Sequence, residues 1–336
     1  MDNTILLDHL NGREAAALLV RGRLDDLLLD ADAPRPGTIY RAFADRPVKG
    51  QGGMFLRTPD GTAFLRQIKG LAPGQPVLVQ ITGYAEPGKA LPVTAKLLFK
   101  SRYVIVTPEA PGLNISRAIK DDEIRVRLME IAHAAAPEQG LILRSSCEGA
   151  GDEDIAADIA AMLDLAAKVL PEIKGDQPEK LVEGEGPHAL AWREWVDPAE
   201  VITAPGSFVE QDVLDQIDAL QNPHVPLSGG AHMYIEPTRA LIAVDVNTGR
   251  DTSPAAGLKA NLACTRELPR QLRLRGLGGQ ITLDLASMPK KERRGFESAL
   301  RAALRKDRTE TELVGWTPLG HYELQRKRDR IPLEKM

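Results

Sequence analysis

Two aspartates and one asparagine occupy positions where paired carboxylates could hold a cation. Asp245 and Asn247 lie in the apolar stretch LIAVDVNTGR, and Asp284 ends a second apolar stretch, GGQITLDLASM. Residues two apart on a β-strand point to the same face, so the side chains of Asp245 and Asn247 lie on the same face of their strand. If the two strands are neighbours, the carboxylates converge, and crowded carboxylates need a compensating cation. Oxygen-only ligands suit magnesium or manganese. The alternative is that both acids are turn residues at strand ends.

Residues 289–308 predict an amphipathic helix that carries a basic face. At about 100° per residue, the apolar side chains gather on one side. The opposite side carries Lys290, Arg294, Arg301, Arg305 and Arg308. The formal net charge of the chain is −4, yet the residues from Lys259 onward include 18 Lys or Arg against 10 Asp or Glu. This face suits a phosphate backbone, and the alternative is an ordinary solvated face.

The composition predicts a globular protein of two or three domains, with 336 residues that are 43% hydrophobic and 27% charged. No apolar run is long enough for a transmembrane helix, and the first residues lack the apolar core of a signal peptide. A cytoplasmic location is therefore expected. Cys147 and Cys264 are far apart, which favours buried reduced thiols over a zinc site.

Short apolar runs separated by turn residues between 38 and 100 predict a small antiparallel barrel. Long helices are expected at 152–170, 208–220 and 257–275, and Pro269 should kink the last of these. The stretch 171–200 is rich in proline, glycine and acids, which indicates a connection rather than part of a core.

Several segments together resemble the catalytic region of the ribonuclease E/G family. They are GGAHMYIEPTRALIAVDVNTGR, NLACTRELPRQLRLRGLGGQITLDLASM, FESALRAALRKDR and LGHYELQRKR. The resemblance implies that Asp245 and Asp284 hold one magnesium ion, or manganese, while Asn247 supports the site by hydrogen bonding. The implied reaction is hydrolysis of single-stranded RNA to 5′-phosphate and 3′-hydroxyl products, in RNA processing or decay. His232 and His321 are expected to be structural or to face RNA.

The resemblance also implies an α+β fold of several subdomains. An RNase H-like subdomain would carry an inserted OB-type barrel and a 5′-sensor region, followed by a DNase I-like α/β catalytic subdomain. The expected boundaries are 1–36 for the first RNase H-like part, 37–100 for the barrel, 101–174 for the 5′-sensor region, 175–228 for the trimmed second RNase H-like part and 229–336 for the catalytic subdomain.

Carried over residue by residue, the family pattern implies further RNA contacts. In the barrel they are Phe55, Phe64 and Lys89, the alternative for the two aromatic residues being a place in the core. The basic helix adds Arg294, Arg301, Arg305 and Arg308.

The pair that senses a 5′-phosphate would be Arg144 and Ser145, because a bidentate arginine suits a phosphate monoester and Ser replaces the usual Thr. Ser101 stands where the family has Gly, which puts end-sensing in question.

The family's CPxC pair, through which two chains share a zinc ion, does not follow the RKR segment here. We therefore expect no zinc and no zinc-linked tetramer, but a monomer or a dimer.

Two other interpretations stay open. One is an RNA-binding protein of the same fold that is catalytically weak or inactive, and the other is a structural or ribosome-associated interaction protein. The presence of Asp245, Asn247 and Asp284 favours the enzyme.

Overall fold

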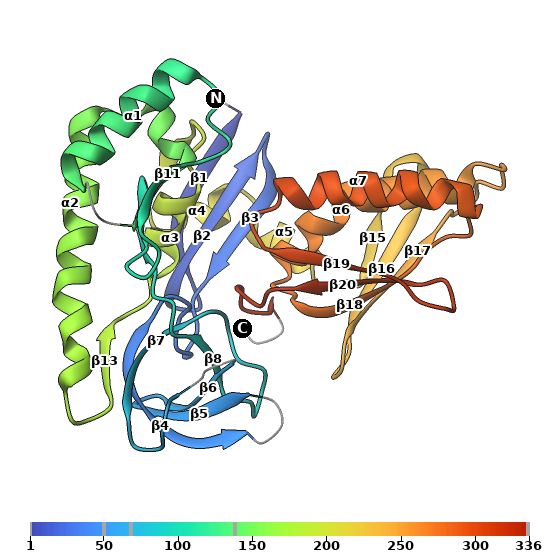
Figure 1. Cartoon of the computed structure of the whole chain (residues 1–336). Helices are drawn as coiled ribbons and strands as arrows, with labels where there is room; N and C mark the ends of the chain where they lie inside the picture. The colour runs from blue at the N-terminus through green and yellow to red at the C-terminus, as the bar shows by residue number, and fades with distance from the viewer. Residues whose placement is uncertain (1, 49–51, 67–69, 137–139, 334–336) are drawn as a thin grey trace. The chain divides into compact units, whose positions relative to one another are not determined.

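The computed structural model describes residues 2–48, 52–66, 70–136 and 140–333. The chain forms two compact units. The inserted unit is Asp32–Val196, and the discontinuous unit combines Met1–Ala31 with Asp197–Met336. Figure 1 shows that the discontinuous unit contains both the blue N-terminal strands and the orange and red C-terminal part.

Five strands of the inserted unit form a closed barrel, because β4 pairs with both β5 and β7. The strands are β4 (Ile39–Val48), β5 (Gly53–Thr58), β6 (Gly61–Leu65), β7 (Pro76–Ile81) and β8 (Leu91–Thr94). Alternate residues such as Leu56, Ala63 and Val79 fill its interior. The predicted barrel is confirmed, but β6 and β8 run parallel, so the expectation of purely antiparallel pairing was wrong there.

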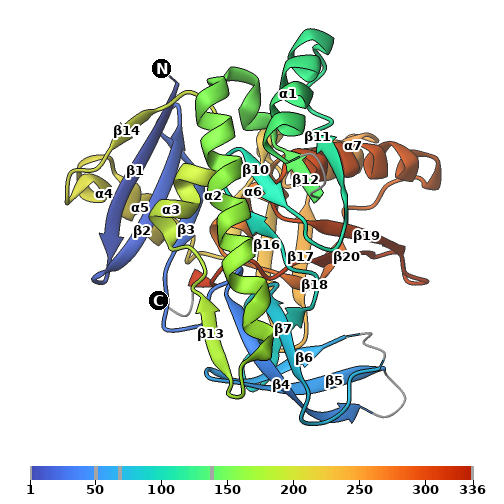
Figure 2. The same cartoon turned by 60° about the vertical axis from the view of Figure 1, so that its left-hand side comes forward.

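A second sheet of the inserted unit has the order β11-β12-β10-β9. Its strands are β9 (Phe99–Lys100), β10 (Val104–Val106), β11 (Gly112–Ile115) and β12 (Gly140–Leu143), and its helices are α1 (Asp122–Ala135), η1 (Ser145–Gly149) and α2 (Asp152–Val169). The predicted long helix is α2, which packs against β10 and β9 (Figure 2). Ile155 and Ile159 of α2 join the same core as Cys147. Burial raises the pKa of the Cys147 thiol to about 11.

The expectation that residues 171–200 are only a connection was wrong. They form η2 (Leu170–Lys174), β13 (Glu179–Val182), α3 (Pro187–Glu194) and β14 (Glu200–Ile202). The nearly buried side chain of Arg41 holds the segment from η2 to β13. It donates to the carbonyl of Gln177 at 2.8 Å and to that of Glu172 at 2.7 Å. Apolar patterning missed these elements because they are short and depend on contacts with distant segments, such as Arg41 for β13 and the pairing of β14 with β1.

The discontinuous unit begins with a four-stranded sheet of order β14-β1-β2-β3. The strands β1 (Asn3–Leu10), β2 (Arg13–Val20) and β3 (Arg23–Leu29) are antiparallel, and β14 pairs parallel with β1. Two short helices, α4 (Ser207–Glu210) and α5 (Val213–Ala219), pack Phe208 and Val213 on this sheet. One helix was predicted here, but Asp212 has a φ of 55° and divides it.

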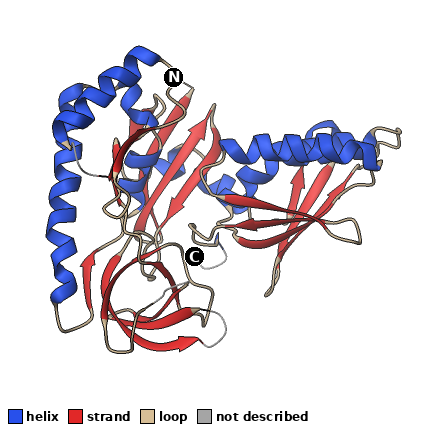
Figure 3. Cartoon of the chain, viewed as in Figure 1, coloured by secondary structure: helices blue, strands red, loops and turns tan. Residues whose placement is uncertain are grey.

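The other sheet of this unit has six strands in the order β15-β16-β17-β18-β20-β19. They are β15 (His224–Pro226), β16 (His232–Pro237), β17 (Ile242–Asn247), β18 (Gly279–Asp284), β19 (Thr311–Trp316) and β20 (Tyr322–Arg326). The helices α6 (Ala256–Leu274) and α7 (Arg293–Lys306) cover one face of this sheet, as Figure 3 shows, while η3 (Ser228–Gly230) and η4 (Lys290–Glu292) lie in its loops. The opposite face carries polar and exposed residues.

Helix α6 connects the two parallel strands β17 and β18. It continues through Pro269 as one helix. Leu268 and Leu272 are fully buried against the sheet, and Cys264 lies beside them with a thiol pKa raised to about 12 by burial. Both cysteines are free and buried, as predicted.

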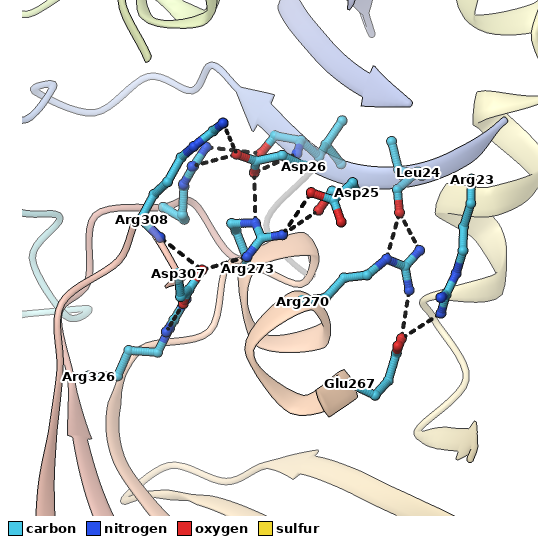
Figure 4. A network of polar contacts seen from close by, with 12 residues as sticks. Arg23, Leu24, Asp25, Asp26, Glu267, Arg270, Arg273, Asp307, Arg308 and Arg326 are labelled. Carbon is cyan, nitrogen blue, oxygen red and sulfur yellow. Dashed lines mark hydrogen bonds and ion pairs between the residues drawn. The ribbon is translucent and has the colours of Figure 1, made fainter. Parts of the chain in front are cut away.

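A charged network joins β3 to α6 and β20 within the discontinuous unit (Figure 4). The carboxylate of Asp307 is inaccessible to solvent and lies 2.5 Å from a guanidinium nitrogen of Arg273 and 2.6 Å from one of Arg326. Arg273 also contacts Asp25 and Asp26 of β3, at 3.1 and 3.4 Å. Since nearly all these groups are buried, each depends on its partners for compensation of charge.

In the described part of the chain, no helix is both long and apolar enough to cross a membrane.

Candidate active site

The two predicted acids lie side by side at the ends of parallel strands. Asp245 of β17 and Asp284 of β18 are register partners, so the condition that their strands be neighbours is met. Adjacent strands are about 4.8 Å apart, which brings the two carboxylates within reach of one ion. Their neighbours Val244, Val246 and Leu283 are buried beneath the helices. Alternation therefore directs both acids to the uncovered face, where both are exposed.

Two further polar side chains flank the acids. The amide nitrogen of Asn247 donates to Oδ2 of Asp245 at 2.9 Å. On the other side, Nε2 of His321 lies 3.8 Å from Oδ1 of Asp284. His321 directly precedes β20, the antiparallel neighbour of β18. The site thus contains two carboxylates, one amide that orients the first of them and one imidazole beside the second.

The segment that follows Asp284 is held by the start of α6. Asn261 is fully buried; its amide nitrogen donates to the carbonyl of Ala286 at 2.8 Å, and its oxygen accepts from the Ala286 N–H at 3.0 Å. One turn earlier, a Cβ on Gly257 would lie 1.9 Å from the carbonyl oxygen of Ser287. The helix and the loop therefore approach too closely for any larger residue at 257. These contacts fix the chain just beyond Asp284.

Replacing Asn261 by Ala should loosen this end of the site. We expect a loss of about 2 kcal/mol in the free energy of unfolding, because both backbone groups of Ala286 lose their partner. Displacement of Asp284 should also lower the rate of any reaction at the acid pair by about 10-fold to 100-fold. Urea unfolding and activity measurements on Asn261→Ala, compared with the exposed α6 variant Arg266→Ala, test this. Equal stability and activity of the two variants would refute the positioning role.

The acid pair fits a hard divalent cation by its chemistry. Asp245, Asp284 and Asn247 offer only oxygen atoms as metal ligands, because the amide nitrogen of Asn247 donates a hydrogen bond to Asp245. Magnesium takes one or two carboxylates and keeps waters for a phosphate ligand. Among the described residues, no group of three or more His, Cys, Asp and Glu side chains is arranged to hold a metal. A magnesium ion held by these two carboxylates would keep waters in its remaining positions.

The basic helix face does not lie beside the acid pair. Phe296, Leu300 and Leu304 of α7 belong to the core beneath the sheet, so the exposed Arg301 and Arg305 point away from it. The acids project from the other face of the sheet. The sheet itself therefore separates these groups, although they are close in sequence.

The ends of the basic helix also differ from the prediction of a helix over 289–308. Helix α7 spans Arg293–Lys306; Lys290 lies in η4, and the C-cap Asp307 is extended. Arg308 lies outside the helix and pairs with the buried Asp26 at 3.5 Å. The helix ends early because Arg273 and Arg326 hold Asp307. Arg294 is exposed on α7, as the predicted basic face requires.

In the inserted unit, the predicted RNA-contacting aromatic residues lie outside the barrel core. Phe55 and Phe64 are register partners whose ring centroids are 5.3 Å apart, while their strand neighbours Met54 and Leu65 fill the interior. The alternative that both are core residues is therefore wrong. Lys89 is exposed in the turn before β8. The guanidinium of Arg46 lies over the Phe55 ring, 5.2 Å from its centroid, so a cation already adjoins this aromatic pair.

The predicted 5′-sensor residues follow β12. Ser145 is exposed, but the guanidinium of Arg144 already has internal partners. It lies 2.6 Å from the carboxylate of Glu194 and donates to the carbonyl of Ser101 at 2.6 Å. Burial disfavours the charged form of Glu194, yet Arg144 and Arg193 outweigh it and hold the pKa of that carboxyl below its usual range. The guanidinium of Arg144 is thus already paired with an internal carboxylate.

Comparison with known proteins places the chain in a family. The model of the ribonuclease E/G family matches residues 99–200 and 194–329, which include both acids and Arg144. The chain belongs to the ribonuclease E/G family.

Characterised relatives are similar along nearly the whole chain. Ribonuclease G of Salmonella typhimurium is 28% identical over 99% of this chain and 81% of its own length. Ribonuclease G of Escherichia coli K12 is 27% identical with the same coverage. Ribonuclease E of a Nostoc species is 27% identical over 94% of this chain and 54% of its own length.

In this member of the ribonuclease E/G family, the sequence alone did not place three residues that lie around the predicted sites: Asn261, His321 and Glu194. Asn261 could have been noticed as a lone amide on the apolar side of a helix. His321 was assigned a structural or RNA-facing place, and its position beside Asp284 depends on the pairing of β18 with β20. Glu194 gave no signal, since its contact with Arg144 joins segments 50 residues apart.

Proposed function

We propose that this protein is a magnesium-dependent endoribonuclease, with manganese as an alternative ion, that hydrolyses single-stranded RNA in RNA processing or decay. The products would be a 5′-phosphate and a 3′-hydroxyl. The observation that carries the proposal is the register pairing of Asp245 with Asp284 on an uncovered sheet face. The finer fold assignments belong to the same proposal: an OB-type barrel, an RNase H-like subdomain and a DNase I-like catalytic subdomain.

The chain's own residues would act by holding and orienting. Asp245 and Asp284 would bind the ion, and the hydrogen bond from Asn247 would keep Oδ2 of Asp245 in place. The ion would supply Lewis acidity toward the scissile phosphate and a water of lowered pKa for in-line attack. Phe55 and Phe64 would stack on unpaired bases, and Lys89 and the α7 arginines would neutralise phosphates away from the cut.

The test is cleavage of an unstructured, 5′-monophosphorylated RNA with magnesium and with EDTA. We expect internal cuts only with the metal, and the ends can be identified by their reactivity toward ligase and kinase. Binding without cleavage would favour the alternative of an inactive RNA-binding protein. Cuts that leave cyclic phosphates or that persist in EDTA would exclude the proposed reaction.

We propose further that Arg144 and Ser145 receive a 5′-monophosphate once the phosphate displaces Glu194. The parent protein should then discriminate weakly between 5′-monophosphate and 5′-hydroxyl RNA. The variant Glu194→Gln removes the competing charge and should raise the preference for the monophosphate about 10-fold, since a hydrogen bond to a charged group contributes about 1.5–3 kcal/mol.

The matching controls are Glu148→Gln, an exposed acid on η1, and the double variant Glu194→Gln/Arg144→Gln. The first should behave like the parent, and the second should lose the gained preference. A preference that survives removal of Arg144 would eliminate its sensing role.

A further inference from the structure

Three aromatic side chains cluster on β15 and β16, on the face of the six-stranded sheet that the helices leave uncovered. They are His224, His232 and Tyr234. The two imidazole centroids are 5.1 Å apart, and the Tyr234 ring lies 5.2 Å from His224 and 5.6 Å from His232, edge-on to both. Their strand neighbours Val225, Met233 and Ile235 are buried on the helix side. The cluster is therefore not part of the core.

The cluster directly adjoins the acid pair. Tyr234 is the register partner of Asp245, and His232 is the register partner of Asn247, across the antiparallel pair β16–β17. Directly opposite residues on neighbouring strands have Cβ atoms about 5 Å apart and share a face. Moving across the sheet, the order is therefore His224, Tyr234, Asp245 and Asp284. The aromatic rings begin one strand away from the carboxylates.

The cluster remains accessible to a ligand. Tyr234 is 36% exposed, which is unusual for a large aromatic residue inside a strand. His224 is exposed and His232 is half-buried. An exposed group of aromatic rings beside a polar site is typical of a recognition surface.

The neighbouring charges indicate what this surface would bind. Close to two carboxylates, an anionic group is repelled unless a cation intervenes, whereas a nucleobase is uncharged and has two π-faces. Aromatic side chains stack on bases with little sequence preference. An RNA strand whose phosphate lies at the acid pair would place the base of an adjoining nucleotide within one strand spacing, where the rings lie.

We propose that His224, His232 and Tyr234 form a base-stacking subsite for a nucleotide that adjoins the scissile phosphate. The inference rests on the proposed function, because it takes the acid pair as the place of the phosphate. The subsite would orient the RNA over the acids. It would require an unpaired base, and so would select single-stranded RNA at the cut itself rather than only at the barrel.

The test measures RNA binding in an Asp245→Asn background, where the substrate stays intact. The probes are an unstructured 5′-monophosphorylated RNA and a series of the same RNA with one abasic nucleotide at successive positions. Tyr234→Ala should weaken binding of the intact RNA about 10-fold, the effect of losing one stacked base. Tyr234→Trp should bind like the background protein, and so should Gln280→Ala, an exposed change on β18.

At one position, the abasic nucleotide should weaken RNA binding by the background protein about 10-fold. The same abasic RNA should bind the Tyr234→Ala variant as well as the intact RNA does. Urea unfolding of each variant checks that the fold is retained. Equal RNA affinity of Tyr234→Ala and the background protein would overturn the proposal. A loss of affinity that is the same at every abasic position would also overturn it.

The outcomes separate this inference from the proposed function. If the parent does not cut RNA but binding depends on Tyr234 and one base, the nuclease proposal fails, while base stacking on the three rings stands. If the parent cuts RNA and Tyr234→Ala binds as well as its background, the subsite fails alone. Absence of RNA binding by both the parent and the Asp245→Asn protein would overturn both.

Discussion

The Asp245→Asn variant should lose RNA cleavage by on the order of a thousandfold, because it removes one of two carboxylates that hold the ion and its activated water. Asn is nearly isosteric with Asp, and Asp245 is exposed, so the fold should be retained. Asn at 245 keeps an oxygen but loses the charge that attracts the cation. The loss should appear in the cleavage rate far more than in RNA affinity.

The companion variants make this expectation specific. Asp284→Asn should cause a similar loss, and the double variant should be hardly worse than either single one, since both acids serve the same ion. Glu312→Gln neutralises an exposed acid on β19 of the same sheet and should leave cleavage unchanged. Losses from Asp245→Asn and Asp284→Asn that multiply in the double variant would argue for two independent roles.

The Asp307→Asn variant should lower the free energy of unfolding by about 3–5 kcal/mol, the effect of breaking a buried ion pair. The carboxylate of Asp307 is inaccessible to solvent and accepts hydrogen bonds from both Arg273 and Arg326. Arg326 is itself almost fully buried, at 1% exposure. Without this carboxylate, the buried guanidinium groups of Arg273 and Arg326 lose the negative charge that lies between them. Urea unfolding followed by circular dichroism measures the loss.

Glu310→Gln is the matched control, because it neutralises an exposed acid only three residues away. It should change stability by less than about 0.5 kcal/mol. The effect of Asp307→Asn should also persist in high salt, since buried pairs are poorly screened. If the two variants are equally stable, the network in Figure 4 contributes no net stability through Asp307.

The features that sequence predicted well depend on local patterns. Strand alternation placed Asp245 and Asn247 on one face, and the ends of two apolar runs located Asp245 and Asp284 at strand ends, although their pairing was assumed rather than derived. The barrel followed from closely spaced apolar runs. The burial of Leu300 and Leu304 followed from the helical period of α7. In each case, the hydrophobic pattern of a short segment determines which side chains are covered.

The features that sequence missed depend on contacts between distant segments. The end of α7 depends on Arg273 and Arg326, and the order of β13 depends on Arg41. The engagement of Arg144 depends on Glu194. The relation of the basic helix to the acids was inferred from nearness in sequence, whereas the sheet places them on opposite sides. None of these contacts leaves a periodic signal in the chain.

Titration of manganese into the protein, followed by the electron paramagnetic resonance signal of the free ion, tests whether the acid pair holds a metal. We expect the parent to bind one ion that magnesium displaces. Both Asp245→Asn and Asp284→Asn should lose this binding, while Glu312→Gln should keep it. Unchanged binding of the ion by Asp245→Asn and Asp284→Asn would contradict the assignment of the acid pair as the metal site.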